Sequence, residues 1–177
     1  MNFFVMKWNI YYKLTVLSWV LLLSFSCGKS SSENQNENKT SETLELKSQS
    51  LDFPNQPIFL SPEAKEAVED WELYQAMETE IERMESFKLE DLIVNSSVIY
   101  KAADTLQKTL PQKLRNRPVS ARLKVLHSKT AQLKQLAERQ QPDFQEMKKV
   151  ANEVPIDFYN LNIQINELFL EFPPMEQ

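Results

Sequence analysis

The chain has 177 residues, with 25 acidic and 20 basic side chains, a net charge of −5, and only one histidine, one cysteine and one glycine. Hairpin turns with positive φ usually need glycine, and phosphate-binding loops need several, so this composition argues against an all-β fold and against a nucleotide-binding α/β fold. One cysteine and one histidine are also too few for an internal disulfide or for a zinc site built from several such ligands.

The first 26 residues have the features of an export signal. They carry Lys7 and Lys13 and no acidic residue, followed by a mostly apolar run from Leu14 to Ser26 that ends in small side chains. This order of charged, apolar and small residues is typical of a secretory signal. The apolar run is shorter than the roughly 20 residues that a membrane-spanning helix needs.

The only cysteine of the chain ends the sequence Leu21-Leu22-Leu23-Ser24-Phe25-Ser26-Cys27. This stretch resembles the lipobox of bacterial lipoproteins, in the relaxed form common in Bacteroidota. The resemblance implies cleavage before Cys27 and attachment of fatty acids such as palmitate to it, and several acyl chains hold a protein stably on a membrane. The alternatives are an ordinary cleaved signal and an uncleaved signal anchor, each with an incidental cysteine.

The residues after the cysteine predict a location in the cell envelope. Gly28 stands where an aspartate would resemble the inner-membrane retention signal of other lipoproteins, which favours the outer membrane. Many surface-exported lipoproteins of Bacteroidota have acidic residues directly after the cysteine, whereas here Lys29 and three serines precede Glu33. We therefore expect an outer-membrane lipoprotein that faces the periplasm.

Residues 27–60 are expected to form a lipidated tether. From Gly28 to about Ser50 the chain is almost free of apolar residues, so it cannot bury enough surface to offset the entropy lost on ordering. The following stretch from Leu51 to Leu60 is apolar and interrupted by prolines. It is expected either to lie extended against the domain or to serve as a docking strip.

Residues 61–177 predict one all-α domain, an antiparallel bundle of about four helices. Ser61-Pro62-Glu63 is typical of a helix start, and Gln140-Gln141-Pro142 of a short turn between antiparallel neighbours. Apolar residues recur at helical steps in four stripes: Ala64, Ala67, Trp71, Tyr74, Met77, Ile81 and Met84; Leu92, Ser96, Ile99, Ala103, Leu106 and Leu110; Val119, Leu123, Leu126, Thr130, Leu133 and Ala137; Met147, Ala151, Val154, Phe158, Leu161, Ile165, Leu168 and Phe172.

Two helix boundaries need separate arguments. No glycine or proline follows Pro62 until Pro111, so the first two stripes could belong to one long helix. We place a break between Ser86 and Asp91, because the two halves of such a rod could not pack on each other. The fourth stripe keeps its register through Pro155, which predicts one kinked helix rather than two.

Charge is unevenly distributed along the domain. Residues 61–91 hold eleven acidic and three basic residues, whereas residues 101–139 hold ten basic and two acidic ones. These faces are expected to be solvated and to complement each other within the bundle. Lys113, Arg115 and Arg117 lie in a loop between Pro111 and Pro118 without an acidic neighbour, so we expect them to contact an acidic partner surface or anionic lipid headgroups. Simple solubility is the alternative.

No catalytic constellation is evident in the sequence. A serine or cysteine triad would have to use His127, and the lipid would consume Cys27. The sequence therefore predicts a lipid-anchored structural or protein-interaction role with an envelope partner, and no enzyme activity, cofactor, metal or nucleic acid. The competing interpretation is a bundle that binds haem or a metal, with Met77, Met84 and Met147 beside His127 as the candidate haem ligands.

Overall fold

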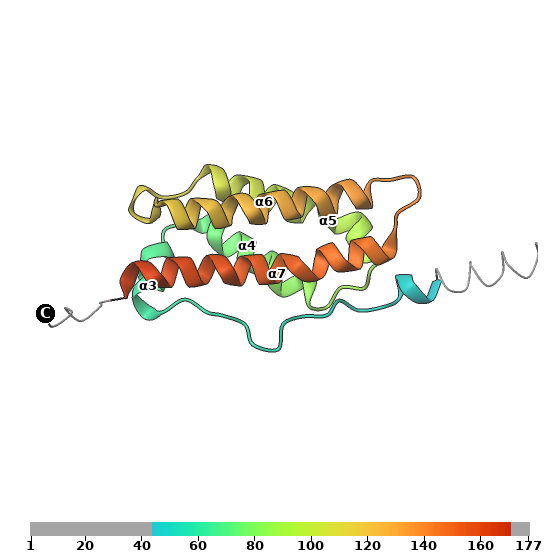
Figure 1. The fold of residues 1–177 in the computed structure, drawn as a ribbon, viewed down its shortest axis with the longest axis horizontal. Helices are drawn as coiled ribbons and strands as arrows, with labels where there is room; N and C mark the ends of the chain where they lie inside the picture. Colours follow the sequence, from blue (N-terminus) through green and yellow to red (C-terminus); the bar gives the residue numbers. More distant parts are fainter. Residues whose placement is uncertain (1–43, 171–177) are drawn as a thin grey trace, which may run out of the picture. The chain divides into compact units, whose positions relative to one another are not determined.

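The computed structural model describes residues 44–170 (Figure 1). The predicted signal segment, Cys27 and the first part of the expected tether lie outside this range. The helices of the domain are α3 (Pro62–Val68), α4 (Glu72–Met84), α5 (Asp91–Lys108), α6 (Arg117–Ala137) and α7 (Phe144–Asn166), with short 3-10 turns η2 (Gln112–Leu114) and η3 (Glu167–Phe169). The all-α prediction is confirmed.

Helices α4 to α7 form an antiparallel bundle. Successive helices run in opposite directions, with α6 and α7 in front in Figure 1, α5 behind α6, and α4 behind α7. The most extensive contacts join α5 to α6 and α6 to α7. Helix α4 packs mainly on α5 and meets α7 over a smaller area. The antiparallel arrangement predicted for the last two helices is confirmed.

Capping side chains fix where three helices begin. The Ser61 hydroxyl accepts from the backbone N–H of the third residue of α3 at 3.2 Å, and Pro62 occupies the first helical position. Asn116 caps α6 at 2.7 Å, and the Asp143 carboxylate accepts from two N–H groups of α7 at 3.0 Å each. No residue between 44 and 170 has positive φ, so the connections are built without left-handed turns.

The four apolar stripes form the core. Their members are buried up to Ile165 in the last stripe, and Ser96 and Thr130 are buried among them. Helix α7 continues through Pro155 as one helix. The prediction is wrong for Leu168, whose side chain is 37% exposed, because α7 ends at Asn166 and η3 no longer follows the same face. Phe172 lies outside the described residues.

The first stripe spans two helices instead of one. Trp71 separates α3 from α4 with φ of −97° and ψ of 74°, and its backbone N–H donates to Val68 at 2.9 Å. Its indole ring is buried and donates through Nε1 to the Thr109 hydroxyl at 3.1 Å. This interaction holds the break against the end of α5. The predicted break between Ser86 and Asp91 is confirmed, since α4 ends at Met84 and α5 begins at Asp91.

Residues 44–60, here called the strap, run along α7 (Figure 1). After one helical turn, the strap pairs with the α4–α5 connection: the N–H of Leu89 donates to Gln49 at 3.0 Å, and the N–H of Glu90 to Lys47 at 3.1 Å. The side chain of Leu51 is buried in the core, and Leu46, Phe53 and Leu60 pack against it. The prediction that Leu51 to Leu60 lies against the domain is therefore confirmed at both ends of that stretch, and residues 44–50, which were expected in the tether, also contact the domain.

Burial at the centre of α7 predicts a large effect of truncation on stability. Phe158 is 1% exposed and packs its ring 5.4 Å from that of Tyr74. Phe158→Ala should lower the free energy of unfolding by about 3 to 5 kcal/mol in urea titrations, because it removes apolar contacts and leaves a cavity. Ile156→Ala, two residues away and 47% exposed in the parent chain, is the control and should cost about 1 kcal/mol or less. Equal losses would contradict this assignment of the core.

Candidate functional site

The predicted basic residues lie together at one end of the bundle. Lys113 lies in η2, Arg115 follows that turn, and Arg117 is the first residue of α6. All three side chains are exposed, whereas Leu114 between them is fully buried. The buried leucine fixes the turn to the core, so the loop presents its charges on a supported backbone.

The three basic side chains of this loop have no acidic partner among residues 44–170. Arg115 donates to the backbone carbonyl of Leu110 at 3.3 Å, which leaves its charge uncompensated. Some other basic residues of the domain are paired, as in Lys108 with Asp104 at 2.7 Å, whereas Lys101, Lys124 and Lys149 also lack an ion pair among residues 44–170 but do not lie together in one loop. The loop is therefore a concentrated positive patch on an acidic protein.

The expected pairing between the acidic and basic halves of the domain is not observed among the described residues. Arg83 pairs with Glu80 at 2.8 Å within the acidic half, and Lys134 pairs with Glu138 at 2.8 Å within α6. Lys129 pairs with Glu153 of α7. The other ion pairs of the described residues also stay within one helix or join neighbouring segments, as in Lys148 of α7 with Asp52 at 3.2 Å, and none joins residues 61–91 to residues 101–139.

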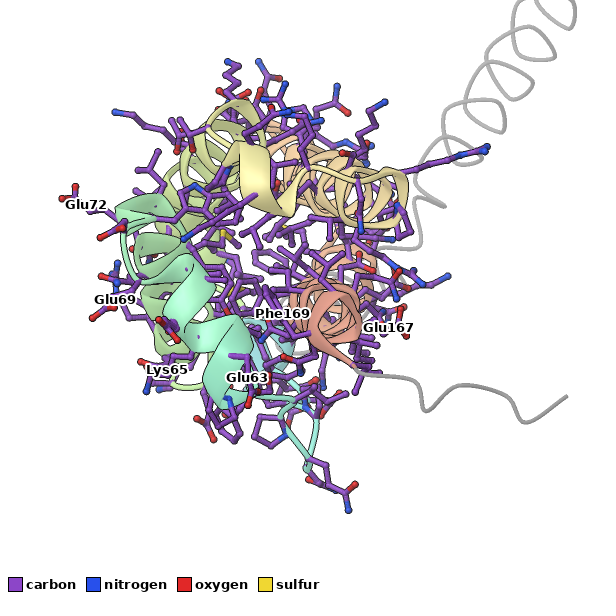
Figure 2. The ribbon with its side chains drawn as sticks, turned by 90° about the vertical axis from the view of Figure 1, so that its left-hand side faces the viewer. Glu63, Lys65, Glu69, Glu72, Glu167 and Phe169 are labelled. Carbon is purple, nitrogen blue, oxygen red and sulfur yellow. The ribbon has the colours of Figure 1, made fainter. Side chains whose placement is uncertain are left out.

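A cleft of about 720 Å³ opens at the same end of the bundle, between α3, α4 and the end of the strap. Its lining combines apolar and acidic side chains: Phe59, Leu60, Pro62, Lys65, Glu66, Val68, Glu69, Tyr74, Gln75 and Glu78. Figure 2 looks onto this end, where Glu63, Lys65, Glu69 and Glu72 project outwards from α3 and the start of α4. Burial, reinforced by the neighbouring Glu82, raises the pKa of Glu78.

His127 lies on the side of the bundle between α5 and α6. Its Nε2 is 3.4 Å from the Asp104 carboxylate, and its ring centroid is 5.4 Å from that of Tyr100. Asp104 also binds Lys108, and that hydrogen bond is the main cause of the lowered pKa of its carboxyl group. The methionines considered with His127 as haem ligands, Met77, Met84 and Met147, are core side chains with no exposed surface.

Asp157 on α7 is the least satisfied acidic side chain of the described range. Its Oδ2 atom is buried and has no hydrogen-bond partner between residues 44 and 170. Burial raises the pKa of this carboxyl group, and the nearby Glu153 adds to the shift, while Lys129 and Arg122 oppose it. Perturbed carboxyl groups mark functional sites in some proteins, but this one lies beside a structural ion pair.

The raised pKa of Asp157 predicts a pH-dependent effect on stability. Ionisation is easier in the unfolded chain than in the folded one, so it destabilises the fold as pH rises above the ordinary value of 3.8. Asp157→Asn should therefore raise the urea midpoint at pH 7 and lose this advantage at pH 3. A lower midpoint at pH 7 would show that the carboxylate is instead stabilised by Lys129 and Arg122.

Within residues 44–170, no group of three or more histidine, cysteine or acidic side chains is arranged to hold a metal ion. In the same range, no helix has both the length and the apolar character needed to cross a bilayer. No protein-family model matches the chain, and no curated protein or solved structure is significantly similar to it. Function has therefore to be inferred from the side chains themselves.

Sequence reasoning found the basic loop and expected Leu51 to Leu60 to lie against the domain, but it missed the cleft, the asparagines that bind the strap and the contacts of residues 44–50. The cleft depends on the break between α3 and α4 at Trp71, and the sequence around Trp71 contains no glycine or proline that would predict a break. The strap is bound by Asn152, Asn162 and Asn166 of α7. Asparagine is a poor helix former, so the repeated asparagines beside the most regular apolar stripe were the signal in the sequence that could have indicated these contacts.

Proposed function

We propose that the protein is a lipid-anchored component of the cell envelope with a structural or protein-interaction role and no catalysis of its own. The lipobox-like residues before Cys27 support attachment through lipid. The proposed location is the outer membrane, facing the periplasm, on the basis of Gly28 and Lys29. The proposed partner is an envelope protein with an acidic surface.

The position of the basic loop carries this proposal. The strap begins beside the α4–α5 connection and the start of α7, where Lys47 lies 5.4 Å from the centre of the Phe144 ring. The basic loop follows the other end of α5, at the opposite end of the bundle (Figure 1). Helix α7 has 23 residues, so the two ends are separated by about 35 Å. The loop therefore lies at the end of the described domain that is farther from Leu44, the first described residue.

This separation favours a protein partner over the headgroups of the anchoring membrane. Uncompensated charges at an interface mainly accelerate association and select the partner, and both effects weaken as salt screens them. A loop supported by a buried leucine and free of pairing within the domain suits that role, since binding breaks no internal ion pair.

The charge of the loop predicts salt-sensitive partner binding. Replacing Lys113, Arg115 and Arg117 by glutamine should remove a protein that co-purifies from membranes at low salt, and high salt should remove it from the parent protein as well. The control replaces Lys101, Lys124 and Lys149 by glutamine, because these lysines are exposed and equal in charge. An identical partner set for both triple variants, with unchanged helicity, would exclude the loop as the contact.

The proposed anchor predicts dependence on one residue. Cys27→Ala should abolish labelling by radioactive fatty acid and leave the protein either released from membranes or as uncleaved precursor, because no other residue can form the thioether. Fractionation and mass determination of the parent and variant proteins provide the measurement. Fatty-acid label on the Cys27→Ala protein would contradict lipidation at this site.

A further inference from the structure

The side chains of three asparagines on α7 bind the backbone of the strap. Asn152 Oδ1 accepts from the N–H of Asp52 at 3.0 Å. Asn166 Nδ2 donates to the carbonyl of Phe59 at 3.0 Å, and its Oδ1 accepts from the N–H of Ser61 at 2.8 Å. The strap is thus held at both ends by amide groups that can donate and accept at once.

Asn162 makes the central and most buried of these contacts. Its Nδ2 donates to the carbonyl of Ile58 at 2.8 Å, and its Oδ1 accepts from the Tyr74 hydroxyl at 2.8 Å. Its side chain is 2% exposed with the strap in place, and the hydrogen bond from Tyr74 of α4 orients the amide independently of the strap. Helix α7 therefore presents a preformed set of donors and acceptors for an extended main chain.

Most of these contacts do not depend on the side chains of the strap. Three main-chain groups of the strap, and the N–H of Ser61 directly after it, bind asparagine amides, and any extended peptide carries such groups. Among the strap side chains, Leu51 is buried at 7% exposure, whereas Phe59 is 70% exposed. The surface selects an extended backbone with an apolar side chain near its start.

The strap also leaves part of the adjoining space empty. Phe59 and Leu60 line the cleft of about 720 Å³, whose other walls carry three acidic side chains, Glu66, Glu69 and Glu78, and one basic side chain, Lys65, so that acidic groups are in excess. The exposed Phe59 side chain neither fills the cleft nor pairs with its carboxylates. A peptide with a basic side chain at that position would complement the cleft in charge and fill it.

We propose that the α7 surface formed by Asn152, Asn162 and Asn166 is a binding site for an extended peptide, which the chain's own strap occupies. The partner it fits is an extended segment of another protein, with an apolar residue at the position of Leu51 and a lysine or arginine at the position of Phe59. This site goes beyond the proposed role of the basic loop and does not depend on it, so either proposal can fail alone.

The strap acts as a tethered competitor for this site. A segment joined to its site by a short linker has an effective concentration in the millimolar range. A free peptide therefore binds the intact chain weakly, and binding becomes measurable once the strap is weakened. This competition makes the site testable with the strap sequence itself as the probe.

The experiment measures fluorescence anisotropy of a labelled peptide with the sequence of residues 49–60 against the full chain in detergent. Leu51→Asp combined with Phe53→Asp weakens the strap, and this variant should bind the peptide about tenfold or more tightly than the parent chain. If circular dichroism shows that the variant is unfolded, a protease site inserted after the exposed Asn55 gives the same test after cleavage. Equal affinity of the free peptide for strap-weakened and intact chains would overturn the proposal.

Matched asparagine variants separate this site from a general loss of packing. In the strap-weakened chain, Asn152→Ala with Asn166→Ala should reduce peptide affinity about tenfold, because two hydrogen bonds to the main chain of the peptide are lost. Asn160→Ala, on the same helix, should leave affinity within about twofold. The same loss for Asn160→Ala, or no loss for the pair, would contradict recognition by the asparagines.

A second peptide tests the chemistry of the partner. The peptide with Phe59→Arg should bind the strap-weakened chain about threefold more tightly than the unmodified peptide at low salt. This gain should vanish in a chain that also carries Glu66→Gln and Glu69→Gln. Equal affinity of the two peptides for the chain with intact glutamates would exclude a basic residue at this position.

Discussion

The buried amide of Asn162 fixes three parts of the chain relative to one another. It accepts from Tyr74 of α4 and donates to Ile58 of the strap, each at 2.8 Å, from within the apolar face of α7. A buried amide without partners would destabilise the fold, so α4 and the strap must both be in place. Burial raises the pKa of the Tyr74 hydroxyl far above its ordinary value, which keeps it protonated as the donor.

This hydrogen-bonded pair adds a polar link between α4 and α7, which also meet where the rings of Tyr74 and Phe158 pack 5.4 Å apart. Helices α5, α6 and α7 pack over long apolar faces, whereas the side of the bundle between α7 and α4 is completed by the strap. The strap also ties its first residues to the α4–α5 connection through backbone hydrogen bonds. One end of the domain thus receives the N-terminal segment, and the other end carries the basic loop and the acidic cleft.

The sequence predicts the helices well because their signals are local. The four stripes, the Ser61-Pro62 start and the turn before Pro142 each depend on residues within one or two helical turns. The break before Asp91 also followed, although from a packing argument rather than from a breaker residue. The sequence also identifies Lys113, Arg115 and Arg117, because a run of basic residues without an acidic neighbour, placed between two prolines, can be recognised from the linear sequence.

The remaining features depend on contacts between distant residues. The break at Trp71 is held by Thr109, which lies 38 positions away, so the uninterrupted stripe gives no sign of it. The strap is bound by α7 residues about 100 positions away, so its hydrogen bonds could not be predicted, although the apolar residues from Leu51 to Leu60 favoured packing against the domain. The cleft follows from both features, since α3 turns across the end of the bundle and the strap ends beside it.

Native-state hydrogen exchange tests most directly whether Asn162 joins the strap to the bundle. The account predicts that the N–H groups of Asp52 and Ser61 are protected, and that Tyr74→Phe lowers their protection far more than that of α5 and α6, because strap opening is a local event. Exchange of both amides at the rates of an unfolded chain would contradict it. So would equal loss of protection throughout the domain in the Tyr74→Phe protein.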